Sequence, residues 1–337
     1  MKRILITGGC GFIGHHLVEH LLKNTTWQIN ILDRLSYASN GLNRLRDIRA
    51  FNENRVRIFT ANLELGITEG LEKEIGEVDY VLHLAAETHV DRSITEPLTF
   101  VRANVLGTAQ LLEWARRQEN LETFLYFSTD EVFGPAPPGT AYEEWSRYNS
   151  TNPYSASKAG AEELTLAWGN TFNLPVTIVH VMNAFGERQH PEKFIPLVVK
   201  KVLTGESVTI HSNKDKTKPG SRFYIHARNI SDGILFLLKN CPASRDKYNI
   251  VGEKEVDNLT LAQMIANILD KPLNYELVDF HSSRPGHDLR YALSGIKMAG
   301  LGWAPPCSFE SSLEKTIRWM VDPAHATWLY EVLDRQQ

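Results

Sequence analysis

The chain has 337 residues, of which 42% are hydrophobic and 23% are charged, and its formal net charge at pH 7 is −4. This composition is typical of a folded globular protein with one large or two modest domains, and it excludes an extensively disordered chain. The net negative charge argues against a general nucleic-acid binder and against a protein that docks on anionic membranes, since both need a basic surface.

Nothing along the chain predicts export or membrane insertion. No apolar run approaches the roughly 18 residues that a spanning helix needs, and the first strand begins at once with no signal-peptide core before it. The three cysteines, Cys10, Cys241 and Cys307, are isolated in the sequence and predict neither a disulfide framework nor a metal site. We therefore expect a cytoplasmic protein without a structural or catalytic metal.

Apolar stretches rich in β-forming residues recur through the first half of the sequence. They cover 3–7, 28–32, 56–59, 78–84, 123–128 and 176–181. Segments with helical periodicity separate most of them, of which 100–117 and 154–172 are the longest. The alternation predicts an α/β fold, a Rossmann doubly wound parallel sheet covered by helices on both faces, over residues 1–185.

The pattern changes after about residue 185, where the predicted elements become shorter and more mixed. Helices are expected at 193–204, 229–239 and 260–269, and strands at 207–211, 222–226 and 273–278. We interpret 186–337 as a smaller mixed α/β substrate lobe, with chain crossings between the two parts. The polar segment 211–221 is expected to be a solvated loop.

A glycine-rich turn follows the first strand and leads into an amphipathic helix. Its glycines, Gly8, Gly11 and Gly14, allow a tight turn, close approach of the backbone to a pyrophosphate and close packing of helix on strand. Phe12 and Ile13 lie in the same turn. The second strand ends in Asp33, about 20 residues on, where a carboxylate accepts hydrogen bonds from the adenosine ribose and favours NAD over NADP. The neighbouring Arg34 keeps this preference from being absolute.

Small and apolar residues end the strand at 78–84. Leu84, Ala85 and Ala86 suit a position beneath a cofactor at the carboxyl edge of the sheet, whereas His83 is expected to be a buried packing residue. In the polar segment that follows, Thr88 is the expected ligand contact.

A phenol and an ammonium are predicted to lie on one face of the helix at 154–172. Tyr154 and Lys158 are spaced i and i+4, downstream of a strand that ends at Ser128 and Thr129. An ammonium beside a phenol favours the phenolate and lowers its pKa, so the tyrosine can take a proton from a sugar hydroxyl while hydride leaves the same carbon. The Thr129 hydroxyl would orient that substrate oxygen.

Six segments in order resemble the extended short-chain dehydrogenase/reductase superfamily and, within it, nucleotide-sugar 4,6-dehydratases of the dTDP-glucose 4,6-dehydratase type. They are ITGGCGFIG, HLAAETHVDRSI, FSTDEVFG, NPYSASKA, NAFGERQHPEKFIPL and RPGHDLRYA, so the resemblance extends over most of the chain. The resemblance implies a Rossmann domain with bound NAD and a nucleoside-diphosphate hexose as substrate. It also implies a homodimer formed through the helices at 100–117 and 154–172.

The adjacent carboxylates Asp130 and Glu131 distinguish a dehydratase from related 4-epimerases, which need no acid–base pair beside the threonine. By resemblance, oxidation at C4 makes the C5 proton acidic, Glu131 removes it, Asp130 protonates the departing C6 hydroxyl, and the hydride returns to C6. Asp130 must then be protonated while Glu131 is ionised, and adjacent carboxylates in a partly desolvated cleft separate their pKa values in this way. The implied product is a 4-keto-6-deoxy sugar, made by a lyase.

The resemblance also supplies binding residues. Asn62 and Leu63 join the cofactor contacts, to which Tyr154 and Lys158 also belong. The substrate contacts are Thr88, Thr129, Asn183, Lys193, Thr209, His211, Arg222, Arg284 and His287. The two arginines match diphosphate-binding positions, since forked guanidinium donors bind phosphate oxygens in pairs.

Several positions depart from the pattern of the superfamily. Phe223 and Asn229 replace acidic residues, and His226 replaces a tyrosine. The loop at 211–221 adjoins the expected base-binding strand, which leaves dTDP-glucose and UDP-glucose both open. Two other functions also stay open: a 4-epimerase or decarboxylase of the same superfamily, and a member that binds NAD(H) without turnover. The sequence does not say whether the deoxysugar serves rhamnose or another product.

Overall fold

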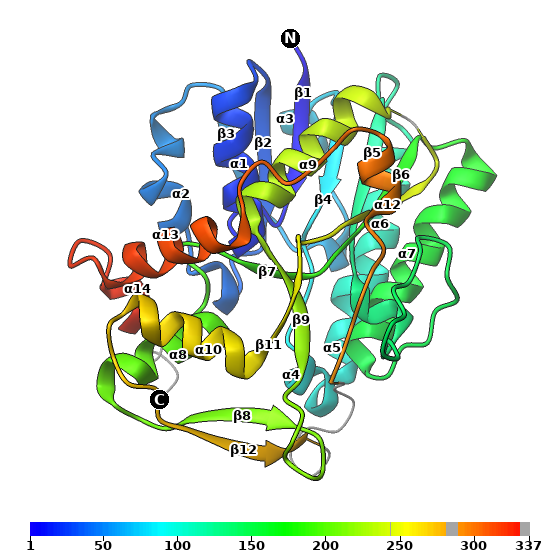
Figure 1. Cartoon of the computed structure of the whole chain (residues 1–337). Coiled ribbons are helices and arrows are strands. Elements are labelled where there is room, and N and C mark those ends of the chain that lie inside the picture. Colours follow the sequence, from blue (N-terminus) through cyan, green and yellow to red (C-terminus); the bar gives the residue numbers. More distant parts are fainter. Residues whose placement is uncertain (243, 281–288, 331–337) are drawn as a thin grey trace.

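A seven-stranded parallel sheet is the largest element of the computed structural model, which describes residues 1–242, 244–280 and 289–330. The strands follow the order β10-β6-β5-β4-β1-β2-β3, and every neighbouring pair is parallel (Figure 1). They are β1 (Arg3–Thr7), β2 (Gln28–Asp33), β3 (Val56–Thr60), β4 (Tyr80–His83), β5 (Thr123–Thr129), β6 (Val176–Val181) and β10 (Lys247–Ile250). The predicted doubly wound sheet is confirmed, including all six strands expected in the first half of the chain.

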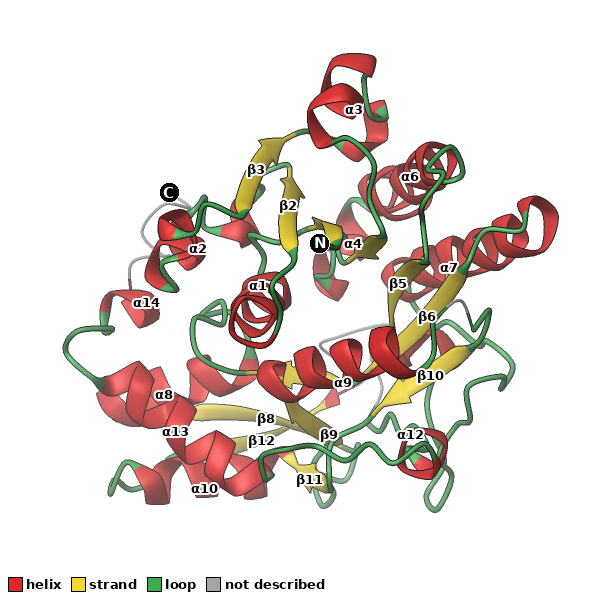
Figure 2. Cartoon of the chain, turned by 90° about the horizontal axis from the view of Figure 1, so that it is seen from above, coloured by secondary structure: helices red, strands yellow, loops and turns green. Residues whose placement is uncertain are grey.

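Helices cover both faces of this sheet (Figure 2). On one face lie α1 (Phe12–Asn24) and α9 (Ala227–Asn240), and on the other lie α3 (Glu69–Ile75), α6 (Gly107–Ala115) and α7 (Pro153–Phe172). Successive side chains of a strand point to opposite faces. Ile4 and Ile6 accordingly pack in the apolar cluster of α1 and α9, and Leu5 packs in the cluster of α6, all three fully buried. A strand buried on both faces explains the uninterrupted apolar run at the start of the sequence.

The helix predicted at 100–117 is interrupted. It begins as α5 (Pro97–Phe100), continues as the π-helical segment η4 (Val101–Leu106), and ends as α6 at Ala115. Asn104 in the π-helical segment is buried, and its amide donates to the backbone oxygen of Glu87 at 3.0 Å and to the Ser157 hydroxyl at 2.9 Å. The segment therefore ties the loop after β4 to α7, which periodicity alone did not indicate.

The second part of the chain forms the smaller mixed α/β lobe that was predicted. Its strands are β7 (Asn183–Phe185), β9 (Ser221–His226) and β11 (Glu255–Asp257) in one sheet, and β8 (Val208–Ser212) and β12 (Tyr275–Asp279) in another. Its helices include α8 (Phe194–Thr204), α10 (Asn258–Ile268), α13 (Phe309–Val321) and α14 (Thr327–Tyr330). Helices α8, α10 and α13 bury their apolar faces together in one cluster. The sequence analysis did not predict β7, β11 or α13.

Strand β10 returns the chain to the large sheet, where it pairs with β6. Its four residues include Lys247 and Asn249, both buried. Alternation of polar and apolar residues is a strand pattern, but this run has only four residues and the sequence analysis did not predict it.

The remaining short elements shape the edges of the sheets. They are η1 (Tyr37–Ser39), α2 (Asn43–Asp47), η2 (Ala50–Asn52), η3 (Leu63–Leu65), α4 (Val90–Thr95), η5 (Asp130–Phe133) and α12 (Ile296–Gly300). Over the described ranges, the chain has no helix that is both long and apolar enough to span a bilayer.

Candidate active site

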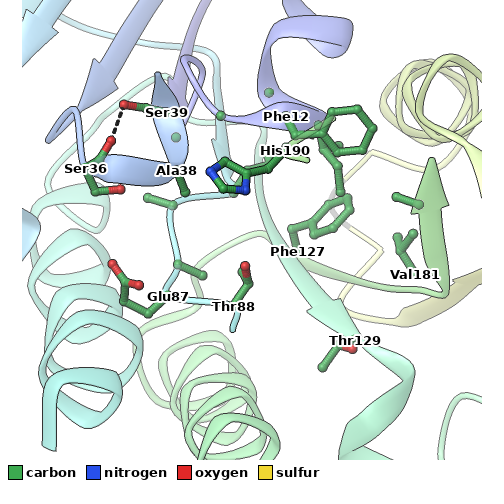
Figure 3. Close-up of a pocket in the computed structure, with 18 of the residues that line it drawn as sticks. Phe12, Ser36, Ala38, Ser39, Glu87, Thr88, Phe127, Thr129, Val181 and His190 are labelled. Atoms are coloured by element: carbon green, nitrogen blue, oxygen red, sulfur yellow. Dashed lines mark hydrogen bonds between the residues drawn. The ribbon is translucent and has the colours of Figure 1, made fainter. Parts of the chain in front are cut away.

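One cavity of about 390 Å³ opens at the carboxyl ends of β1, β2, β4, β5 and β6. In a parallel sheet this edge is where ligands bind. Figure 3 shows side chains from several of these strands and their loops turned toward it, among them Thr88, Thr129 and Val181. Every predicted cofactor residue lines the cavity: Gly8, Gly11, Phe12, Ile13, Gly14, Asp33, Asn62, Leu63, Leu84, Ala85, Ala86, Tyr154 and Lys158.

The glycine turn is close-packed at two positions. Gly8 has φ +73°, and a Cβ there would lie 2.7 Å from the backbone nitrogen of Ala85. A Cβ on Gly14 would lie 2.1 Å from the carbonyl oxygen of Gly8. Only glycine fits either place, so α1 can start directly against the strand and present its first backbone amides to the cavity.

Asp33 has a fixed orientation at the end of β2. Its carboxylate accepts hydrogen bonds from the backbone N–H of Cys10 at 3.0 Å and of Leu35 at 2.8 Å. Burial raises its pKa, and these bonds oppose the rise. The adjacent Arg34 forms ion pairs with Glu64 at 3.1 Å and with Glu87. The guanidinium that qualified the NAD preference is thus already engaged by two carboxylates.

Thr129, Asp130 and Glu131 lie where β5 turns into η5. The Thr129 hydroxyl accepts from the Glu131 backbone N–H at 3.4 Å and donates to Asp130 Oδ1 at 3.1 Å. Asp130 is 5% exposed, and its Oδ2 has no hydrogen-bond partner among the described residues. Burial raises the pKa of Asp130 to about 7, and the neighbouring Glu131 adds to the rise against the opposing charge of Arg222. Asp130 can therefore carry a proton near neutral pH, as a general acid must.

Asn152 links the two parts of the site. Its side chain caps α7 by accepting from the Ser155 backbone N–H at 2.8 Å, and Pro153 occupies the first position of the helix. Its amide also donates to Glu131 Oε2 at 3.2 Å. The residue that starts the helix of Tyr154 thus also orients Glu131. The Asn-Pro pair predicted the helix start but not this second contact.

The lowered pKa predicted for Tyr154 is wrong for the protein alone. Burial raises the pKa of the phenol well above its usual value, and the charge of Glu131 raises it further, while a hydrogen bond with Thr129 opposes both. The Lys158 ammonium has other partners: it donates to the Phe127 carbonyl at 2.6 Å and lies 4.3 Å from the centre of the Tyr126 ring. Spacing placed the two side chains on one helix face but did not reveal this competing acceptor.

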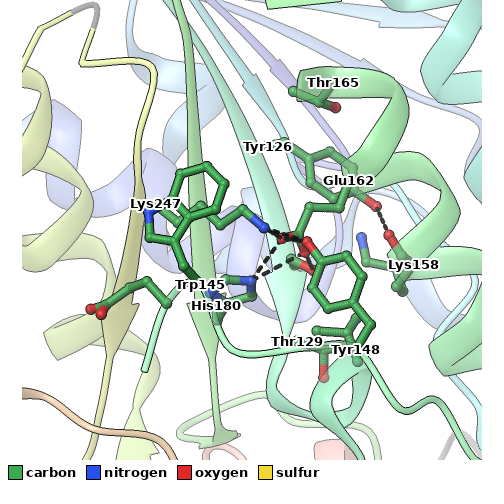
Figure 4. A network of polar contacts seen from close by, with 12 residues as sticks. Tyr126, Thr129, Trp145, Tyr148, Lys158, Glu162, Thr165, His180 and Lys247 are labelled. Carbon is green, nitrogen blue, oxygen red and sulfur yellow. Dashed lines mark hydrogen bonds and ion pairs between the residues drawn. The ribbon is translucent and has the colours of Figure 1, made fainter. Parts of the chain in front are cut away.

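A network of buried polar side chains lies directly behind the site (Figure 4). At its centre Glu162, fully buried, accepts from the Ser128 hydroxyl at 2.7 Å, from His180 at 3.0 Å and from Tyr148, and it pairs with Lys247 at 2.9 Å. Burial raises the pKa of Glu162, but His180 and Lys247 outweigh it and hold the pKa well below its usual value. Glu162 is therefore ionised.

This charge acts on Lys158, one helical turn away on α7. Burial lowers the pKa of Lys158 to about 7, and the charge of Glu162 opposes the shift. The ammonium form of Lys158 thus depends on a residue outside the cavity.

The predicted substrate contacts divide into three groups. Thr88, Thr129, Asn183 and Lys193 line the cavity. Thr209, His211 and Arg222 are not in its described lining. Arg284 and His287 lie outside the described residues.

Each of the three residues outside the lining has a contact of its own. The Thr209 hydroxyl donates to Glu276 at 3.1 Å, and the His211 ring stands edge-on to Phe280 with centroids 6.2 Å apart. Arg222 donates to the carbonyls of Ser221 and Leu289, both at 2.7 Å. Its charge nevertheless reaches Asp130. Arg222 is therefore electrostatically part of the site.

Sequence reasoning missed several polar residues of the cavity wall, among them Arg44 and His190. Arg44 is 1% exposed and donates to the carbonyls of Ala38 at 2.7 Å and of Arg188 at 3.0 Å. His190 is also buried in the wall. Neither belongs to a periodic pattern, and both reach the cavity only through tertiary contacts.

Comparison with known proteins identifies the family. The NAD dependent epimerase/dehydratase family matches residues 4–251. The chain is 37% identical to the dTDP-glucose 4,6-dehydratase of Salmonella typhimurium, over 98% of this chain and 95% of that protein. The solved structure of DesIV, the dTDP-glucose 4,6-dehydratase of Streptomyces venezuelae with NAD bound, is similar with a TM-score of 0.87 and 33% identity, over 98% of this chain and 100% of that one.

An epimerase of the family is more distant. The UDP-glucose 4-epimerase of Thermus thermophilus in complex with NAD has a TM-score of 0.81 and 26% identity, over 94% of this chain and 98% of that one. The protein belongs to the NAD dependent epimerase/dehydratase family.

Proposed function

We propose that this protein is an NAD-dependent hydro-lyase that converts dTDP-glucose to the 4-keto-6-deoxy sugar. The observation that carries the proposal is the meeting, in one cavity, of Tyr154 and Lys158 with a carboxyl group, Asp130, whose pKa is raised to about 7. Oxidation alone needs the first two groups, and loss of water needs the third as well. The resemblance to dTDP-glucose 4,6-dehydratases over nearly the whole chain supports this choice.

The residues present fit NAD. Helix α1 has thirteen residues, no acidic residue in its first turn, and no side chain capping its first amides at Gly11. Such a helix start offers N–H groups and a positive dipole end to a pyrophosphate. Asp33 stands one strand away to receive the ribose hydroxyls. When bound, NAD takes up a hydride from the sugar and returns it later in the same cycle.

The protein side chains then handle protons. Tyr154 takes the proton of the sugar hydroxyl that becomes the ketone, and Thr129 positions that oxygen. Because the pKa of Tyr154 is raised in the protein alone, the phenol needs added positive charge to ionise, which a bound nicotinamide cation would supply. Glu131, held by Asn152, removes the C5 proton, and Asp130 gives its proton to the departing C6 hydroxyl. As the hydride returns to C6, Glu131 gives its proton back to C5, and the proton that Tyr154 gained replaces the one that Asp130 lost.

We infer a division of labour along the chain. Residues 1–185 would hold NAD and the catalytic groups, and residues 186–337 would hold the nucleoside diphosphate. Lys193 in the cavity wall and Arg222 beside it support this, since both carry positive charge. Base contacts by Thr209 and His211, and diphosphate contacts by Arg284 and His287, stay predictions.

We also propose a homodimer that works in the cytoplasm, on a route to a deoxysugar such as rhamnose. Exposed apolar side chains on α5, η4 and the end of α7 support the dimer: Leu98 is 65% exposed, Val101 45%, Leu106 44% and Phe172 44%. Apolar groups gathered on neighbouring helices are typical of a subunit interface. Size-exclusion chromatography with light scattering would test it.

Mass spectrometry of the product tests the proposed reaction. The purified protein is incubated separately with dTDP-glucose and UDP-glucose, without added NAD. Loss of one water from dTDP-glucose is the expected result, and the same loss from UDP-glucose would instead assign the uracil nucleotide. An unchanged mass with conversion to the galactose epimer would make the protein an epimerase, and no change with either sugar would favour NAD(H) binding without turnover.

A further inference from the structure

A second cavity, of about 240 Å³, lies between α1, α9 and α13. Its lining is almost entirely polar and has no residue in common with the lining of the cofactor cavity. The lining residues are His16, Glu19, His20, Lys23, Glu187, Arg188, His226, Arg228, Lys315 and Trp319. Four Lys and Arg side chains therefore face two Glu side chains.

The carboxylates of the lining are already engaged. Glu19 pairs with Lys23 at 2.5 Å, and Glu187 accepts from His226 at 2.9 Å. Arg188 is paired with Asp47, which is outside the lining, and its guanidinium lies 5.0 Å from the centre of the Trp319 ring. Burial lowers the pKa of His16 to about 3, so this histidine adds no charge near neutral pH.

Two cations remain without a carboxylate. Among the described residues, neither Arg228 nor Lys315 has an ion pair. Arg228 donates from Nη2 to the Ser312 hydroxyl at 3.3 Å, while its buried Nε has no acceptor in the described part of the chain. A buried guanidinium N–H without a protein acceptor is rare in folded proteins, and this N–H can donate to an anion held in the cavity.

The secondary structure adds to the positive charge of this cavity. Arg228 is in the first turn of α9, a helix of 14 residues whose N-cap is the lining residue His226, and the Arg228 backbone N–H donates to His226 Nδ1 at 3.0 Å. The N-terminal end of a helix carries partial positive charge and favours anions. Arg228 and Lys315, which have no carboxylate partner within the described ranges, thus lie at this cavity together with the N-terminal end of α9.

We propose that this cavity binds a small phosphate-bearing anion, either inorganic phosphate or a short phosphate ester. The forked N–H groups of Arg228 suit two phosphate oxygens, and Lys315 supplies a second positive charge. Pockets for drug-sized ligands have volumes of about 300–1,000 Å³, so a cavity of 240 Å³ suits a smaller ligand than a nucleotide. The site is independent of the proposed dehydration, because none of its residues is assigned to catalysis or cofactor binding.

Calorimetric titration with inorganic phosphate tests the proposal. The protein is saturated with NAD and kept at constant ionic strength with chloride, so that general screening does not change during the titration. Phosphate is expected to bind at one site. Arg228→Gln should weaken the affinity by roughly tenfold or more, and Lys315→Gln by roughly threefold to tenfold, since each removes a charge-assisted contact. Lys315 is exposed, so its substitution leaves the fold intact.

Two controls locate the bound phosphate. Arg318→Gln removes a cation from the same helix, α13, where it pairs with Glu314 outside the cavity, and should leave the affinity unchanged. Arg222→Gln should also leave it unchanged. If phosphate binding were lost in Arg222→Gln but kept in Arg228→Gln, the ion would be in the proposed substrate site and the proposal would be wrong. Absence of binding, or equal affinity in the wild type, Arg228→Gln and Lys315→Gln, would overturn it as well.

Discussion

Two buried carboxylates, Asp130 at the cavity end of β5 and Glu162 in the polar layer directly behind that strand, have pKa values shifted in opposite directions. Asp130, on the cavity side, is 5% exposed and has one carboxylate oxygen without a partner among the described residues. Glu162, behind the strand, is fully buried and is contacted by Ser128, Tyr148, His180 and Lys247. The pKa of Asp130 is raised to about 7, and that of Glu162 is held well below its usual value.

The difference shows that burial alone does not set the charge of a carboxylate. Desolvation is the largest influence on the pKa of both residues and has the same sign for both. The hydrogen-bond and ion-pair partners of each carboxylate decide its charge. Glu162 has such partners, so it ionises and stabilises the fold, whereas Asp130 has an oxygen without one in the described part of the chain, so it keeps a proton that it can donate. Asp130 thus keeps a carboxylate oxygen available to a substrate, whereas the partners of Glu162 are all protein side chains.

The largest effect is expected at Glu131, the ionised partner that the proposed elimination needs. Glu131→Gln should lower turnover by about 10²–10⁴-fold, because it removes a general base while the amide can still accept from Asn152. Stopped-flow absorbance should still show transient reduction of the bound NAD, followed by a stall. Tyr154→Phe is the matched control and should show no reduction at all. Normal turnover of Glu131→Gln would mean that the C5 base has been assigned wrongly.

Removal of the carboxylate behind the strand should mainly affect stability. Glu162→Ala leaves Lys247 buried without its partner, and we expect a loss of about 3–5 kcal/mol in the free energy of unfolding. Urea denaturation followed by circular dichroism measures it. Glu163→Ala changes the exposed neighbour on α7 and should cost less than about 0.5 kcal/mol. Similar losses in both variants would contradict the role given to the network.

Substitution of Asp130 should raise the free energy of unfolding, whereas substitution of Glu162 lowers it. The folded pKa is raised to about 7 from an ordinary value of 3.8, so the proton-linked stabilisation is complete below 3.8 and is lost as the pH rises through 7. Asp130→Asn imitates the protonated form. It should be more stable than the wild type by on the order of 2–4 kcal/mol at pH 8, and the difference should vanish near pH 4. Denaturation series at both pH values decide this; a difference that does not depend on pH would show that Asp130 is not protonated in the folded state.

The pKa values of Asp130 and Lys158 predict how activity depends on pH. Asp130 must hold its proton and Lys158 must stay cationic, and both have pKa values of about 7. We expect kcat/KM, which reports the free enzyme, to fall at least tenfold per pH unit well above pH 7. A profile measured from pH 5 to 9 with dTDP-glucose tests this, and a constant rate between pH 7 and 9 would contradict it.

Much of the site could be predicted because its residues are adjacent in sequence or spaced along one helix. Gly8 to Gly14 occupy a single turn, Thr129 to Glu131 follow one strand, and Tyr154 and Lys158 share one helix face. Each group has a local pattern with a physical reason. For the same reason the strongly apolar strands were predicted correctly.

The parts that sequence did not reveal depend on contacts between distant residues. Strand β10 is polar at Lys247 and Asn249, and distant partners such as Glu162 and His180 make their burial tolerable. The cavity residue Arg44 is held by Arg188, 144 positions away. The Tyr154 pKa was predicted wrongly because burial and the charge of Glu131 raise it, while Lys158 donates to the Phe127 carbonyl on the strand beneath. No periodicity in a single sequence encodes such pairs.

The smallest effect is expected at Ser128, which is adjacent to Thr129 in sequence but contacts the polar layer behind β5. Ser128 and Thr129 both line the cavity, but the Ser128 hydroxyl donates to Glu162 at 2.7 Å and the Thr129 hydroxyl donates to Asp130. Ser128→Ala should cost only about 1–2 kcal/mol of unfolding free energy, since it removes one of several donors to Glu162, and it should leave kcat within about twofold of the wild type. Thr129→Ala is the matched substitution next to it. That variant should lower kcat by about tenfold or more with little loss of stability, because its hydroxyl orients the reacting oxygen and contacts Asp130 at 3.1 Å. Both variants should be measured for kcat and by urea denaturation. If Ser128→Ala lost as much activity as Thr129→Ala, the comparison would be wrong, because the layer behind β5 would then take part in the chemistry directly.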